Sequence, residues 1–394
     1  MVAKNDEVGY PFSRVSAIDP APELGRVRDR TPMARVKMRD GRDAWLITRY
    51  EDVKQLLGDP NFGTQYPGMM PSSDPEDPMS GFMFLKDPPE HTRLRRNVSK
   101  AFTERRIAGL KPVATELAER LVNAMVSDGD TADLQTAYAY PLPIGVISEL
   151  LGVPDAGRET FRRWSDIVLL TTGLPAEEVE QGFAELRRFI VDVVDAKPDG
   201  PDLLSQLVAD AERGEGLRRP EIYSMALGLL MAGYITTAQA ITTGMLRVLL
   251  NQNLFTGLGT GQIDPAVLVE ELLRCQDEEV GIQRVAQHDV EIRGALVRRG
   301  DTVIISRVGA NRDPSVFECG GDIDLSGANA RTHLTFGHGV HHCLGAALAR
   351  MELNVAITTL AKMVPTLRLA VAPEDIQWRC DGMDVSLVSL PITW

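Results

Sequence analysis

The sequence predicts a mainly α-helical protein with small β-sheets, organised as a single domain over residues 1–394. Long stretches carry apolar residues at helical spacing, the strand-like runs are short, and strands do not alternate with helices along the chain. Hydrophobic residues make up 44% of the chain and charged residues 25%, which are ordinary values for a globular protein with a large buried core.

The first third of the chain is expected to hold short strands and a long loop. Residues 34–38 and 44–47 have the composition of strands, and residues 39–41 between them are typical of a tight turn. Residues 60–89 are rich in proline, glycine, methionine and serine and show no sustained period, which indicates a loop. Because long ordered loops are usually functional, this loop is a candidate wall of a binding site.

Helices are expected to dominate from residue 91 onward. Pro175 and Pro220 lie just at the start of apolar-periodic segments, and Asp264 followed by Pro265 forms a typical helix start. A loop-rich passage follows at 311–335, and a hairpin-like tail ends the chain. The predicted helices cover residues 104–127, 156–170, 176–196, 220–250, a segment after 265, and 344–363; the predicted later strands cover 290–292 and 302–305.

Charge and cysteine content exclude several classes of function. The net charge of −13 gives the protein no general attraction to nucleic acid or to an anionic membrane. No run of 18 uninterrupted apolar residues occurs, so no membrane span is expected. The four cysteines form no C-x-x-C pair and are too few for a disulfide scaffold, so a reducing cytoplasm is the expected location. They are Cys275, Cys319, Cys343 and Cys380.

The strongest local signal is the segment that runs from Phe336 to Gly345. Gly337 and Gly339 allow turns that other residues avoid and permit a close approach to a flat ring. Cys343 then stands at the expected start of a helix, where backbone N–H groups and the helix dipole favour a thiolate. Phe336 would shield the sulfur from water, and Gly345 would leave room for a macrocycle.

This segment resembles the haem-ligand loop of the cytochrome P450 family at every expected position. The resemblance implies a P450 fold, with haem b held between a long distal helix and the helix of the cysteine loop, and with Cys343 as the iron ligand. Glu271 and Arg274 match the E-x-x-R pair of the family. The arginine that usually completes this network in the family is absent from residues 321–324, which leaves the details of the network open.

Four cationic or imidazole side chains match the family's partners of the haem propionates. His91 and Arg95 lie four residues apart, and therefore on one face of a helix. Arg284 and His341 match the remaining two positions. Each alone could be an ordinary surface cation, but together they supply about the charge that two buried carboxylates require.

The long apolar helix matches the oxygen-binding segment of the family. Ala232 and Gly233 would open the helix toward the distal face, and Thr236 matches the threonine that donates a hydrogen bond during oxygen activation. Ile235 stands where the family usually has a carboxylate. The alternative is that Thr236 and Thr237 only bond back to helix carbonyls.

The resemblance implies a cytoplasmic oxidoreductase of secondary metabolism that receives electrons from a ferredoxin and a ferredoxin reductase. Ile235 and the tail at 378–394 resemble P450s that couple aromatic cyclic dipeptides (diketopiperazines) through carbon–carbon or carbon–nitrogen bonds, which makes a small aromatic substrate the first hypothesis. A hydroxylase of a macrolide, terpene or steroid, a peroxide-using P450 and a haem sensor remain alternatives. Six basic residues could dock an acidic ferredoxin, or could form only a solvated helix face. They are Arg93, Arg95, Arg96, Lys100, Arg105 and Arg106.

The expected substrate residues come from segments that contact substrate in the family. The two polar ones, Gln65 and Asp384, could bond the amides of a cyclic dipeptide, although Asp384 could equally be a solvated turn residue. The full set is Gln65, Phe84, Ala232, Val280 and Asp384.

Overall fold

The computed structural model describes residues 8–12, 18–31, 33–64, 81–154, 175–276, 281–329, 331–379 and 386–394. The chain divides into two compact units. The first unit combines Met1–Met70 with Ala266–Cys343, and the second combines Pro71–Pro265 with Leu344–Trp394. Both units therefore join stretches that are far apart in the sequence.

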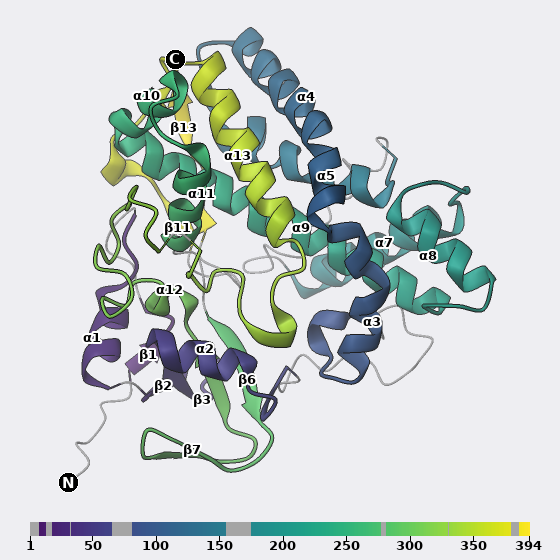
Figure 1. The fold of residues 1–394 in the computed structure, drawn as a ribbon, viewed down its shortest axis with the longest axis vertical. Coiled ribbons are helices and arrows are strands. Elements are labelled where there is room, and N and C mark those ends of the chain that lie inside the picture. Colours follow the sequence, from purple (N-terminus) through teal and green to yellow (C-terminus); the bar gives the residue numbers. More distant parts are fainter. Residues whose placement is uncertain are drawn as a thin grey trace. The chain divides into compact units, whose positions relative to one another are not determined.

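A mixed six-stranded sheet forms the centre of the first unit (Figure 1). Its strand order is β1-β2-β3-β9-β6-β4. β2 and β3 form the predicted antiparallel hairpin, while β9 pairs with β3 in parallel and with β6 in antiparallel. The strands are β1 (Val8–Tyr10), β2 (Met33–Met38), β3 (Asp43–Ile47), β4 (Phe62–Gly63), β6 (Ile282–Ala286) and β9 (Thr302–Ile305), and a separate hairpin consists of β7 (Val290–Ile292) and β8 (Ala295–Val297).

Short helices pack on this sheet. Val53 and Leu57 of α2 belong to one buried cluster with Ile47, Val303 and Ile305 of the strands. Alternation along the strands supplies the apolar face, and the helical spacing of α2 supplies the matching stripe. The helices are α1 (Pro22–Arg30), α2 (Tyr50–Gly58), α11 (Pro265–Arg274), α12 (Arg307–Ala310) and the 3-10 helix η4 (Gly339–His341).

The second unit is mainly helical. Its small sheets are a three-stranded one, ordered β10-β13-β5, and the β11-β12 pair. Its helices are η1 (Met83–Leu85), α3 (Glu90–Val98), η2 (Ser99–Phe102), α4 (Glu104–Asp128), η3 (Gln135–Ala139, a π-helix), α5 (Pro141–Leu151), α7 (Ala176–Asp195), α8 (Leu203–Glu212), α9 (Arg219–Leu250), α10 (Gln252–Thr260), α13 (Ala346–Met363) and η5 (Pro373–Asp375); its strands are β5 (Thr131–Asp133), β10 (Arg368–Leu369), β11 (Trp378–Arg379), β12 (Ser386–Leu387) and β13 (Pro391–Thr393).

The long helix α9 runs through the core of the second unit, where it packs against α5 and α13 (Figure 1). Gly233 lies against Ile147 of α5 so closely that an added side-chain carbon would be 2.9 Å from the Ile147 Cγ1. Among the described residues, α9 alone is long and apolar enough to cross a membrane, but 67% of its apolar window is buried inside the protein. It is therefore a core helix of the second unit.

Most predicted elements are confirmed. β7 and β9 have the predicted bounds, and α4, α7 and α9 differ from them by a residue at most. The final helix begins at Ala346, two residues later than expected, because Gly345 precedes it as the N-cap. The predicted helix at 156–170 lies outside the described residues, as does most of the loop at 60–89.

A buried carboxyl group in α13 makes the stability of the fold depend on pH. Glu352 is fully buried, and neither of its carboxyl oxygens has a hydrogen-bond partner among the described residues. Burial raises its pKa well above the ordinary 4.5. The unfolded chain therefore loses this proton at lower pH than the folded chain, so stability that is present below the ordinary pKa is lost as the pH rises.

We expect Glu352→Gln to remove that pH dependence. Between about pH 5 and about pH 8, the midpoint of thermal unfolding should fall more steeply in the wild type than in the variant. Circular dichroism of both proteins across this range measures the two slopes. Equal slopes would mean that the Glu352 carboxyl ionises alike in the folded and unfolded states.

Candidate functional site

The segment around Cys343 is a closed loop of the first unit. The Cys343 N–H donates to the Phe336 carbonyl at 2.8 Å, and the Gly337 N–H donates to the Leu334 carbonyl at 2.8 Å. Gly337 and Gly339 adopt the left-handed φ angles of 73° and 74° that the sequence predicted for turns. The Cys343 side chain is exposed at the end of this loop.

Gly339 has a second role, because the loop lies directly against α2. A side-chain carbon added at Gly339 would be 2.8 Å from the Gly58 Cα and 2.9 Å from the Leu57 carbonyl oxygen. The sequence predicted that this glycine is small so that the loop can approach a flat ring closely. In the first unit the close approach is to the backbone of α2, which fixes the loop on that helix.

We therefore expect unequal effects from the same substitution at the two glycines. Gly337→Ala should cost about 1 kcal/mol of unfolding free energy, since only its φ angle is unfavourable and the nearest atom is 3.9 Å away. Gly339→Ala should cost at least about twice as much, because the backbone must also move. Urea unfolding of the two variants measures the difference, and equal losses would contradict the tight contact with α2.

The E-x-x-R pair is buried in the first unit. Arg274 Nε donates to Glu271 at 2.9 Å, and Arg274 Nη2 donates at 2.7 Å to the other carboxyl oxygen. Burial by itself would lower the pKa of Arg274, but the hydrogen bonds to Glu271 and the surrounding negative charges together raise that pKa. The two side chains form the ion pair that the sequence predicted.

Backbone groups complete this network where the family uses an arginine. The Arg274 guanidinium also donates to the carbonyls of Asn311, Gly320 and Asp322, and the Asp324 N–H donates to Glu271 at 2.8 Å. These contacts attach the loop at 311–324 to α11. The missing third side chain is thus replaced by main-chain partners.

Each unit contributes two of the four predicted propionate partners. In the second unit, His91 is buried and Arg95 half-buried, one turn apart on α3. In the first unit, Arg284 is half-buried on β6, where its Nη1 donates to the Gln283 carbonyl at 2.9 Å, and His341 is half-buried on η4. The four groups have the chemistry that the sequence indicated, and their role as propionate partners stays a prediction.

An open strip on α9 marks the predicted oxygen-binding segment. Ala232 and Thr236 are exposed and lie one turn apart on a helix that is otherwise largely buried. The Thr236 Oγ1 donates to the Ala232 carbonyl at 2.7 Å, which is the back-bonding that the sequence left open as an alternative. Ile235 beside it is half-buried. The Thr236 hydroxyl oxygen can still accept a hydrogen bond on this open face.

Two aromatic rings bound this strip toward the start of α9. Phe82 and Phe84 form an edge-to-face pair with ring centroids 5.5 Å apart, and both rings lie over Gly228. Gly228 is one helical turn before Ala232, on the same face. Phe84 is 37% exposed, as befits a binding-site wall. The other predicted substrate residues, Gln65, Val280 and Asp384, lie outside the described residues.

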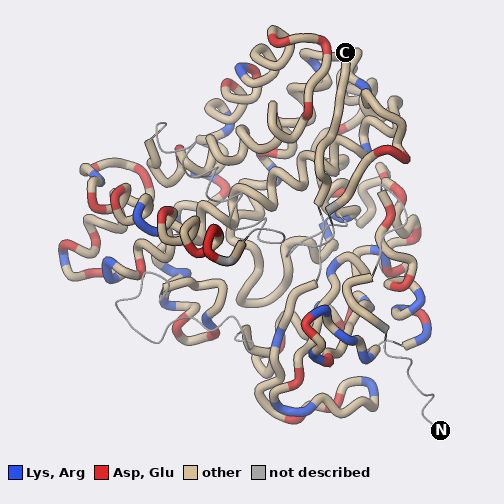
Figure 2. Tube along the Cα trace, turned by 180° about the vertical axis from the view of Figure 1, so that it is seen from behind, with Lys and Arg blue, Asp and Glu red and all other residues tan. Residues whose placement is uncertain are grey.

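The predicted basic cluster is smaller than the sequence suggested. Arg93 forms ion pairs with Glu90 and with the buried Glu221 of α9, so it ties two helices of the second unit together. Arg95 is half-buried. Four of the six predicted cations are exposed, on α3, η2 and the start of α4, namely Arg96, Lys100, Arg105 and Arg106. Part of the net negative charge of the chain lies on α7, which has six acidic and two basic residues (Figure 2).

These residues fit a haem by their chemistry. In the first unit, the exposed thiol of Cys343 lies on a loop that is closed by hydrogen bonds. A thiolate is a strong ligand for haem iron. Histidine and arginine are side chains that pair well with propionates. The open strip of α9 offers small side chains, which a flat apolar ring can approach closely.

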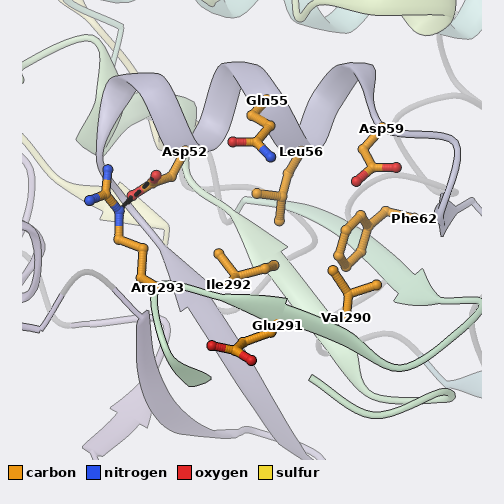
Figure 3. A pocket seen from close by; sticks show the side chains of 9 residues that line it. All are labelled: Asp52, Gln55, Leu56, Asp59, Phe62, Val290, Glu291, Ile292 and Arg293. Atoms are coloured by element: carbon orange, nitrogen blue, oxygen red, sulfur yellow. Dashed lines mark hydrogen bonds and ion pairs between the residues drawn. The ribbon is translucent and has the colours of Figure 1, made fainter. Parts of the chain in front are cut away.

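A cavity of about 220 Å³ in the first unit lies apart from these residues. It is bounded by α2 and by the hairpin of β7 and β8, with Leu56, Phe62 and Ile292 as its apolar lining (Figure 3). At one end Arg293 donates to Asp52 at 2.7 Å, which compensates for the left-handed φ of 49° at Arg293. None of the predicted site residues lines this cavity.

Comparisons with known proteins identify the family. The family model named Cytochrome P450 matches residues 266–392. The chain is 39% identical over 393 residues to mycinamicin IV hydroxylase/epoxidase of Micromonospora griseorubida, covering 98% of both proteins. It is 37% identical over 384 residues to cytochrome P450 monooxygenase PikC of Streptomyces venezuelae, covering 96% of this chain and 92% of that protein.

Solved structures agree with this assignment. The crystal structure of the putative thioether synthase SgvP, involved in the tailoring step of griseoviridin, superposes with a TM-score of 0.90 at 34% identity. The match covers 98% of this chain and all of that one. The fold is therefore the same as in that protein.

Proposed function

This chain belongs to the cytochrome P450 family of haem-thiolate oxidoreductases, and we propose that it is a monooxygenase of bacterial secondary metabolism acting on a macrolide-like small molecule. The observation that carries the proposal is the 39% identity, over almost the whole length, to a hydroxylase/epoxidase. The family and the fold imply haem b as the cofactor. When bound, the haem supplies the iron chemistry that activates dioxygen.

Cys343 is the proposed iron ligand. Its loop is closed by its own N–H on the Phe336 carbonyl and is fixed on α2 at Gly339, so the sulfur has a defined position. As a thiolate, Cys343 would hold the iron and tune its reactivity by donating electron density. His91, Arg95, Arg284 and His341 are the proposed propionate partners.

Thr236 is the proposed hydrogen-bonding group on the distal side. Its hydroxyl donates to the Ala232 carbonyl, so its lone pairs remain able to accept a hydrogen bond from a donor such as water. Ile235 cannot hold or pass a proton, so protons must reach Thr236 through water or through the substrate itself. Phe84 and Ala232 are the described candidates for contact with substrate.

A ferredoxin and its reductase are the proposed electron donors, as in bacterial P450s generally. The exposed cations Arg96, Lys100, Arg105 and Arg106 offer a positive patch on an acidic protein. Such a patch would accelerate association with an acidic partner, and the rate would fall with salt.

Oxidative coupling of an aromatic diketopiperazine is a second candidate, which the apolar Ile235 favours. A substrate with an indole N–H or phenol O–H could supply the hydrogen that the missing carboxylate would otherwise relay. One of the similar solved structures is that of a putative thioether synthase, a protein for which bond formation has been considered. The more similar relatives are oxygenases, so coupling stays the alternative.

Turnover under isotopically labelled dioxygen tests the two candidates. A screen for the Soret shift that accompanies substrate binding first selects the substrate, and turnover then uses a ferredoxin and ferredoxin reductase. We expect a product that carries one labelled oxygen atom. A product that has lost two hydrogens and carries no label would establish coupling instead. Binding without any product under reducing conditions would leave a sensor as the remaining function.

A further inference from the structure

The four residues before the closed cysteine loop, 332–335, are held in place by side chains from several elements of the first unit. Each bond is made to the backbone or side chain of these residues, and the partners come from α2, α12 and the loop that follows it. The bonds run from Tyr50 Oη to the Thr332 carbonyl (2.6 Å), from the Leu334 N–H to Asn311 Oδ1 (2.7 Å), from Arg307 Nη1 to the Thr335 carbonyl (2.7 Å), and from Asn311 Nδ2 to Thr335 Oγ1 (2.9 Å).

A buried carboxylate–imidazole pair completes this support. His333 Nε2 lies 3.0 Å from the Glu270 carboxylate, and both side chains are at most 6% exposed. The Thr335 N–H points to the other ring nitrogen, Nδ1, at 3.4 Å. Because Nδ1 then acts as an acceptor, the proton is on Nε2 and is donated to Glu270.

The pair acts on the loop through an aromatic contact. The ring of His333 lies 5.8 Å from the ring of Phe336. The carbonyl of Phe336 in turn accepts the N–H of Cys343. A continuous set of contacts therefore leads from Glu270 on α11, through His333 and Phe336, to the backbone of Cys343.

The two adjacent carboxylates of α11 have separate partners. Glu271 holds Arg274 and, through it, the loop at 311–324. Glu270 instead holds the segment that leads into the cysteine loop. Arg331 also forms an ion pair with Glu270, but its side chain is 78% exposed and 3.9 Å away, so the imidazole is the closer of these two partners.

We infer that Glu270 is a positioning residue for the haem-thiolate loop: it holds the His333 ring against Phe336 and thereby keeps the Cys343 sulfur where it can bind iron. This inference rests on the proposed ligation of iron by Cys343. Glu270 itself touches neither the cysteine nor any reacting group. Its carboxylate oxygen is required as an acceptor for the His333 Nε2–H.

The test compares three variants of the haem-loaded protein in their reduced, carbon monoxide-bound spectra. In Glu270→Ala, the share of the complex that lacks the red-shifted thiolate band should rise about fivefold, as expected when a buried donor loses its acceptor. Glu270→Gln should stay close to the wild type, because its amide oxygen still accepts the hydrogen bond. Asp52→Ala is the matched control: it removes another buried carboxylate of the first unit, near the start of α2, whereas the cysteine loop contacts the last residues of that helix.

The same variants separate positioning from mere stability. Asp52→Ala should lower the thermal unfolding midpoint and leave the thiolate share unchanged. His333→Asn keeps a donor for Glu270 but removes the imidazole ring that contacts Phe336. It should therefore raise the share of the complex that lacks the thiolate band, even where Glu270→Ala does not yield folded protein. The inference is overturned by an unchanged spectrum in Glu270→Ala or His333→Asn, or by a Gln variant as defective as the Ala variant. Retention of the thiolate band in Cys343→Ala would instead refute the proposed ligand.

Discussion

Replacing Cys343 with alanine is expected to abolish the red-shifted Soret band of the reduced, carbon monoxide-bound protein. The band reports a thiolate bound to the iron, and the side chain at position 343 is the sulfur that the closed loop presents. Cys343→Ser should have the same effect, because a serine hydroxyl does not ionise near neutral pH and is a poor ligand for haem iron. Difference spectroscopy of the purified proteins measures the loss.

Cys319 provides the control for this experiment. It is also an exposed cysteine of the first unit, but it lies in the loop that Arg274 holds and outside the cysteine loop. Cys319→Ala should keep the full band. If that variant lost the band while Cys343→Ala kept it, the ligand would have been assigned to the wrong cysteine.

The fold followed from the sequence wherever local periodicity determines the structure. The apolar spacing of α4 and α9 reflects burial of one helix face, and a proline or polar residue marks each start. The pairing of β3 with β9 did not follow, because their residues are more than 250 positions apart and pair in parallel. No local pattern encodes which distant strand completes a sheet.

The candidate site shows the same limit. The loop at 336–345 is a local motif, so its glycines and its cysteine were predictable, and their φ angles agree with the prediction. Its supports were missed, because Glu270 and His333 are 63 residues apart and belong to no short motif. A carboxylate next to the E-x-x-R pair and a histidine three residues before Phe336 were the available signals.

The substrate prediction illustrates how little two short segments decide. Ile235 and the tail at 378–394 suggested a coupling enzyme, whereas the similarity over the whole chain points to oxygenases. Among the described candidates, Thr236 and Phe84 have exposed side chains. Substrate choice therefore depends on residues that local sequence patterns constrain weakly.

Replacing Arg274 with alanine is expected to destabilise the protein by about 3–5 kcal/mol, because it leaves the Glu271 carboxylate buried without its charged partner. Arg274 is 1% exposed and Glu271 is 3% exposed, so water cannot replace the lost bonds. The three carbonyls of the loop at 311–324 would lose their donor as well. Such a loss is a large part of the 5–15 kcal/mol typical of folded proteins.

An exposed pair of the same spacing gives the matched control. Arg213 and Asp210 on α8 are also three residues apart, but their side chains are 57% and 43% exposed. Arg213→Ala should therefore change the unfolding free energy by less than about 1 kcal/mol. Urea unfolding followed by circular dichroism compares both variants with the wild type. Similar losses would mean that burial of the Arg274 pair contributes nothing beyond an ordinary surface ion pair, and the proposed role of this pair in holding the loop to α11 would then fail.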